Sequence, residues 1–316
     1  NNPESRPAYS CDLYNKLELG LSHAQEQLKS KKFKNELSFV FENMDTSTVS
    51  GVPYLPVMIS ESVAKRFHTR NPDADSETIV ANRISGIDPE NNLLTQFTGS
   101  MHLKCNFYQP FVNSFSINFP SPTISTGMLY YDYYIVDTLS IESRKTYLVH
   151  YHPKKGISSP ALDGEMLVDA GDFALRSIHA KMLHGGNINW VRDIVYDVEY
   201  ERLPDSSWFY RQERLYADFS IVLADSSKAL SVIGKRELNY SNPSFENVKV
   251  AGVKKVNVER DSNFYGEEYW DRVRPYALSR KEKDTYLMVD RFKETPTYQT
   301  WYDIVYTVVT GYWDIG

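Results

Sequence analysis

The sequence predicts an α+β protein that is mainly β: a large curved antiparallel sheet, forming an open half-barrel, packed on helices and followed by a C-terminal helical segment. Six strand-like stretches lie between Tyr130 and Leu223, separated by clusters of turn-forming residues. Aromatic residues make up 14% of the chain, with 23 tyrosines, which favours β structure. A long twisted sheet with one apolar face must be covered, and helices are the available cover.

The six stretches are residues 130–139, 146–153, 161–169, 173–183, 191–203 and 208–224. In the last two, apolar side chains alternate with polar ones, as in strands buried on one face. The residues of one parity are therefore expected to line the space between sheet and helices and to contact a hydrophobic ligand. They are Ile194, Tyr196, Val198, Phe219, Ile221 and Leu223.

Outside this run the patterns are more mixed. Residues 13–21 suit a strand or a helix, 39–45 and 56–68 suit strands, and 91–107 has helical spacing of its apolar residues. Ser279 and Glu282 form a capping box that predicts a helix running to about Lys293. We expect two parts: residues 1–238 with the sheet, and residues 239–316 as a helical extension.

The bulk composition excludes several classes of function. The chain has 316 residues and a net charge of −6, with no basic block, so nucleic-acid binding is not expected. No run approaches the ~20 apolar residues of a membrane helix. The polar first seven residues do not resemble a signal peptide, so we expect a mature chain or an excised piece. Two cysteines, Cys11 and Cys105, leave pairing open, with two separate thiols favoured.

One histidine pair could carry metal chemistry. His150 and His152 are two residues apart on a predicted strand, so both imidazoles face the same way, as in half of a zinc site. His179 or His184 could supply a third ligand. The alternative is a solvated sheet face, which we favour. No nucleophile elbow, phosphate-binding loop or zinc-protease motif occurs, so we expect neither a cofactor nor an enzyme.

Three stretches resemble one known family: residues 14–19, residues 39–87 with their A-x-R-I-S-G element, and residues 269–290. This family is an uncharacterised outer-membrane group typical of Bacteroidetes. Its members join a carboxypeptidase-regulatory-like β domain, a middle soluble region and a C-terminal membrane β-barrel. The resemblance implies that residues 1–316 are the middle region, on the periplasmic side of the outer membrane, and it supplies no catalytic residues.

Residues 146–182 also resemble lipoprotein-carrier proteins of the LolA type in their order of strands and turns. Those proteins curve an antiparallel sheet around helices and hold acyl chains in an apolar cavity. The resemblance implies a non-enzymatic module that binds a lipid or acyl group, a lipoprotein, or a partner protein at the outer membrane. Two alternatives stay open: a metal-dependent hydrolase using His150 and His152, and a structural spacer between two other domains.

Overall fold

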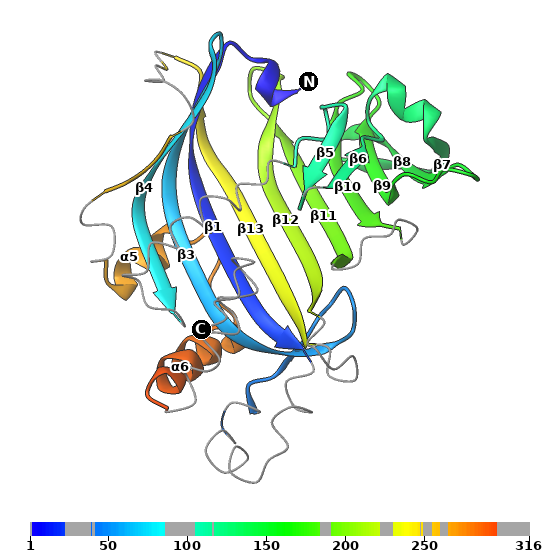
Figure 1. The fold of residues 1–316 in the computed structure, drawn as a ribbon. Helices are drawn as coiled ribbons and strands as arrows, with labels where there is room; N and C mark the ends of the chain where they lie inside the picture. The colour runs from blue at the N-terminus through cyan, green and yellow to red at the C-terminus, as the bar shows by residue number, and fades with distance from the viewer. Residues whose placement is uncertain are drawn as a thin grey trace.

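One large curved sheet dominates the molecule (Figure 1). The computed structural model describes residues 2–22, 39, 42–85, 105–115, 117–183, 191–221, 230–246, 248, 255–259 and 265–295. Along the sheet the strands follow the order β14-β4-β3-β1-β13-β12-β11-β10-β9-β8-β7, and β2 also pairs with β3. All neighbours are antiparallel except β14 and β4. The two outermost strands, β14 and β7, do not pair with each other in the described part of the chain, so the predicted curved and unclosed sheet is confirmed.

The six strands predicted between Tyr130 and Leu223 form one half of this sheet. They are β7 (Tyr131–Ile141), β8 (Arg144–Pro153), β9 (Leu162–Asp169), β10 (Leu175–Met182), β11 (Val191–Arg202) and β12 (Trp208–Ile221). Each pairs with the next one along the chain, as expected for consecutive hairpins. The β7–β8 turn uses Glu142 and Ser143 at φ of 51° and 62°, the backbone that a two-residue hairpin loop requires.

The other half of the sheet comes from both ends of the described chain. Its strands are β1 (Ala8–Ser22), β2 (Asp45–Thr46), β3 (Pro53–Arg70), β4 (Asp73–Ser85), β13 (Leu230–Ser244) and β14 (Lys255–Val258). Strand β13 lies between β1 and β12, so it joins the N-terminal strands to the hairpin run. The domain boundary expected at residue 238 falls inside this central strand.

Two expectations outside the hairpin run meet different outcomes. The range 39–45 was expected to be a strand, but Phe39 and Glu42 are helical and only Asp45 lies in a strand, so that prediction is wrong for these residues. The segment 39–45 is too short for the spacing of its apolar residues to distinguish a strand from a helix. Most of the helix expected over 91–107 lies outside the described residues.

The strand alternation gives the sheet two faces of different chemistry. We call one the aromatic face; on β1 it carries Tyr9, Cys11 and Leu13, all buried. The hairpin β5 (Phe111–Ser114) and β6 (Ile117–Pro120) lies on this side, followed by the short helix η2 (Ser125–Leu129). We call the other the charged face; on β1 it carries Tyr14, Lys16 and Glu18. Cys11 and Cys105 are buried and form no disulfide.

Helices α5 (Glu267–Val273) and α6 (Arg280–Lys293) pack on the charged face, with α6 against β3 and β4 (Figure 1). The predicted capping box is confirmed. The backbone N–H of Ser279 donates to Glu282 Oε2 at 2.7 Å, and the Glu282 N–H donates to Ser279 Oγ at 3.2 Å. These bonds satisfy amides that have no partner within the helix, which explains why α6 begins here.

A buried carboxylate anchors the helices to the sheet. Glu61 of β3 accepts from Arg274 at 2.7 and 2.8 Å through both oxygens, and from the hydroxyls of Tyr14 and Tyr286 at 2.5 and 2.6 Å. Burial alone would raise the pKa of Glu61, but these donors outweigh it and lower the pKa below its usual range. Lys16 adds a second link, with its ammonium 2.5 Å from Glu282 of α6.

Replacing Arg274 with methionine should destabilise the protein by about 3–5 kcal/mol, because the Glu61 carboxylate would remain buried without its cation. Arg280→Met is the matched control, since the Arg280 side chain is 96% exposed, and it should change stability by less than about 0.5 kcal/mol. Urea denaturation followed by circular dichroism measures both. Equal stability of the two variants would show that the Glu61–Arg274 pair does not anchor the helices.

Candidate functional site

The predicted ligand-contacting residues of β11 all lie on the aromatic face, whereas helices α5 and α6 pack on the charged face, so these residues do not face a space between the sheet and those two helices. Ile194, Tyr196 and Val198 are fully buried members of the largest hydrophobic cluster. On β12, Phe219 and Ile221 pair in register with Val232 and Leu230 of β13. Leu223 lies outside the described residues. Whether these residues contact a ligand stays a prediction, but the register brings the described strand positions into one region.

The aromatic end of this face is filled by the protein itself. The rings of Phe107 and Phe119, from the segment of residues 105–121, pack edge-on against Tyr196 with centroids 5.8 and 6.4 Å away. Tyr108 packs edge-on against Tyr200 at 5.7 Å and accepts a hydrogen bond from the Leu175 N–H at 3.0 Å. The sequence pattern did not identify this segment as a cover. Its aromatic content was the available signal.

The opposite end of the aromatic face is aliphatic. Neighbouring positions on five adjacent strands carry small or aliphatic residues, and every one is buried. We call them the aliphatic strip: Met58 of β3, Leu19 of β1, Gly234 of β13, Ala217 of β12 and Ile194 of β11. The smallest residues of the strip, Gly234 and Ala217, lie at its centre, and larger ones lie at its ends.

A buried polar group separates the aromatic and aliphatic ends. Glu213 is fully surrounded by protein; burial raises the pKa of its carboxyl, and the Tyr240 hydroxyl donates to it at 2.6 Å. Arg236, also buried, donates to Asn15 Oδ1 at 3.4 Å. A carboxyl and a guanidinium held within an apolar face can orient the polar end of a bound molecule, since that end is costly to bury without a hydrogen-bond partner.

The charged face carries a row of residues in which acidic and basic side chains alternate from strand to strand. In register order the row is Arg83, Glu61, Lys16, Glu237, Arg214, Asp197, His179, Glu165 and His150. We call it the charged row. Opposite charges directly across antiparallel strands stabilise the pairing. A cavity of about 440 Å³ borders its centre, lined by residues including Lys16, Arg214 and Lys281 of α6.

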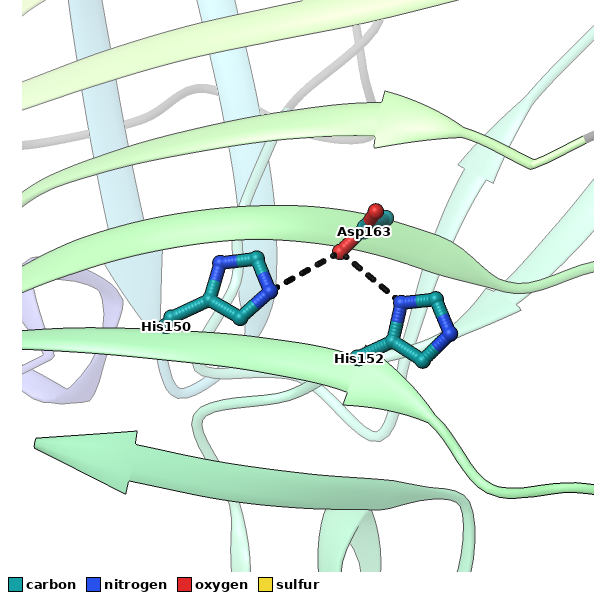
Figure 2. A group of neighbouring side chains, drawn as sticks. All are labelled: His150, His152 and Asp163. Carbon is teal, nitrogen blue, oxygen red and sulfur yellow. Dashed lines mark ion pairs between the residues drawn. The ribbon is translucent and has the colours of Figure 1, made fainter. Parts of the chain in front are cut away.

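His150 and His152, the predicted pair, are half-exposed on this face. The third residue beside them is Asp163. Figure 2 shows Asp163 of β9 between the two rings of β8. Asp163 Oδ1 lies 3.6 Å from His150 Nε2 and 3.3 Å from His152 Nδ1. His179, one of the two histidines that could have supplied a third ligand, is not in this group, and its Nδ1 lies 2.6 Å from Asp197 Oδ1. His184 lies outside the described residues.

A second group of possible metal ligands has a different character. Glu4, His68 and Asp75 meet at a polar cavity of about 710 Å³. The guanidinium of Arg66 lies 3.2 Å from Glu4 and 3.3 Å from Asp75, so both carboxylates already face a permanent cation. This arrangement is a buried ion-pair network, and Arg66 would repel a metal ion.

The fold defines a mainly β protein with one curved, unclosed sheet. The chain belongs to the family of unknown function DUF5686, whose model matches residues 1–231. No curated protein matches it. None of the helices in the described part of the chain is long and apolar enough to cross a membrane.

The solved structures to which this chain is similar are distant from it in sequence and in structure. A Vibrio parahaemolyticus domain described as an outer membrane lipoprotein-sorting protein is 11% identical, covering 80% of this chain and 89% of that one, with a TM-score of 0.24. A LolA superfamily protein from Nitrosomonas europaea is 9% identical, covering 78% and 89%, with a TM-score of 0.22. Lipovitellin is 8% identical, covering 80% and 27%, with a TM-score of 0.31. These scores are too low to support an inference about function.

The Asp197 carboxylate should keep His179 protonated up to a higher pH than an ordinary histidine. The hydrogen bond to Asp197 raises the pKa of His179 despite partial burial. The His179–Asp197 pair therefore stabilises the fold fully below the unfolded-state histidine pKa of about 6.5. This stabilisation is lost as the pH rises through the pKa of His179 in the folded state. NMR titration of the ring should show this raised pKa, and Asp197→Asn should lower it. An unchanged titration in Asp197→Asn would contradict the assigned cause.

Proposed function

We propose that this chain is a non-enzymatic, periplasmic module of an outer-membrane protein, and that it binds a lipid or acyl group on the aromatic face of its sheet. The single observation that carries the proposal is the aliphatic strip, a buried apolar surface continuous over five strands. The resemblance of three sequence stretches to outer-membrane proteins with a membrane β-barrel supports the compartment.

The strip suits an acyl chain for a geometric reason. It runs across the strands from Met58 to Ile194, with Gly234 and Ala217 at its centre, so a linear apolar chain would lie over the smallest residues. Burying each methylene group contributes about 0.8 kcal/mol. Arg236, two residues from Gly234 on β13, would contact the polar end of the bound molecule.

Filling the centre of the strip should block the acyl chain. Ala217→Leu adds a branched side chain at a buried position within the strip, and it should weaken binding of a fluorescent C16 fatty acid at least about fivefold, because overfilling a packed site costs on the order of 1–3 kcal/mol. Arg211→Leu is the control: it introduces the same side chain on β12 at a position where Arg211 is 65% exposed, and binding should not change.

Fluorescence titration measures both variants, and circular dichroism verifies that each is folded. If the unaltered chain shows no saturable binding, or if the two variants bind equally, the lipid proposal is wrong.

A second candidate function is binding of a partner protein, favoured by exposed apolar residues at β7, the outermost strand on one side of the described sheet. We call them the edge patch: Met128 and Leu129 of η2 with Tyr134, Ile135 and Val136 of β7, each more than half exposed. Exposed apolar residues gathered on neighbouring elements can mark interaction sites, and the edge of a sheet can pair with another chain. An outer-membrane partner would fit this position.

Site-specific photo-cross-linking tests this candidate. A photoreactive residue at Ile135 should form a defined adduct with one envelope protein in cells. The same residue at Lys281, a 70% exposed position on α6, should not. No adduct from position 135, or the same adduct from both positions, would exclude the edge patch as the contact surface.

A further inference from the structure

We propose that His150, His152 and Asp163 form a binding site for a divalent transition metal of the zinc class. The proposal is independent of the lipid function, since the group lies on the charged face and the aliphatic strip on the other. All three ligand atoms lie within 4.8 Å of one another. Two imidazoles and one carboxylate are a donor set suited to Zn²⁺.

The distances suit a metal centre. With metal–ligand bonds of about 2.0–2.1 Å, two ligands of a tetrahedral zinc ion are about 3.4 Å apart. The Asp163 oxygen already lies 3.3 Å from one ring nitrogen and 3.6 Å from the other (Figure 2). The two distances to Asp163 are thus already close to those of a tetrahedral site.

Asp163 provides an independent observation. Its Oδ1 is buried and accepts no hydrogen bond from the described residues, although it faces two imidazole nitrogens. A buried carboxylate oxygen without a donor is costly, and native structures rarely keep one without a reason. A cation held between Asp163 and the two rings would satisfy this oxygen.

The surrounding charges favour a cation. In register, Asp132 of β7 lies opposite His152, and Glu165 of β9 lies opposite His150. One cation, Lys181 of β10, lies opposite Asp163, but its ammonium is 3.6 Å from Asp193. The Glu4, His68 and Asp75 group differs, because the Arg66 guanidinium contacts both of its carboxylates.

The site would join two strands near the edge of the sheet. His150 and His152 come from β8 and Asp163 from β9, so a bound ion cross-links their side chains next to the outermost strand, β7. A metal that binds only the folded chain stabilises it by mass action. The half-exposed rings leave a coordination position for water or for a group from another molecule, and the proposal assigns no reaction to it.

Isothermal titration of the full chain, prepared without a histidine tag and treated with a chelator, tests the site with Zn²⁺. We expect one Zn²⁺ per chain and a higher melting temperature when the metal is present. His152→Ala should weaken binding at least about 100-fold, since even loss of groups that only support ligands costs 10–100-fold. His179→Ala is the matched control, because both side chains are 54% exposed on the same face; it should bind as the unaltered chain does.

A second measurement needs no variant. In NMR spectra of the unaltered chain, Zn²⁺ should shift the ring signals of His150 and His152 and leave those of His179 in place. Three results would overturn the proposal: no Zn²⁺ binding, equal loss of affinity in His152→Ala and His179→Ala, or ring shifts confined to other histidines. If His152→Ala fails to fold, the NMR measurement alone decides.

Discussion

The register of one continuous antiparallel sheet is the constraint on which the other features of this protein depend. Because side chains alternate between faces with a period of two, a slip of one residue in any pair would move every side chain of that strand to the opposite face. The charged row makes such slips costly. It meets opposite charges at each step from Arg83 to Glu165, and a slipped strand would place its charged residue among the buried rings of the aromatic face.

Strand β13 makes the two halves of the molecule one sheet. It pairs with β1 over Leu13–Ser22 and with β12 over Gln212–Ile221, so residues more than 200 positions apart in sequence become neighbours. The aliphatic strip exists only because of this insertion: Gly234 separates Leu19 from Ala217, and none of the three segments could form the strip alone. Residues from both ends of the described chain therefore build the surface that we propose as the lipid site.

The sequence predicted those elements that interactions between residues close in the chain determine. The hairpins β7 to β12 follow from alternation and turn residues, and the start of α6 follows from Ser279 and Glu282, whose reciprocal bonds span three residues. The place of β13 could not be read in the same way, because Leu230–Ser244 mixes charged and apolar residues and owes its position to partners far along the chain. The covering role of residues 105–121 is equally non-local, since it consists of ring contacts to Tyr196 and Tyr200.

At the proposed metal site, the Asp163–Gly164 pair shows why the ligand role of Asp163 was hard to predict from the sequence. Asp163 precedes Gly164, and an Asp-Gly pair usually indicates a turn. Here both residues lie inside β9, and the glycine is needed because a Cβ would sit 2.0 Å from the carbonyl oxygen of His179 on β10. Gly164 therefore allows β9 to approach β10 closely. Asp163, one residue earlier, faces the opposite side of the sheet. Gly164 thus allows the two strands to pack, and Asp163 presents its carboxylate to His150 and His152.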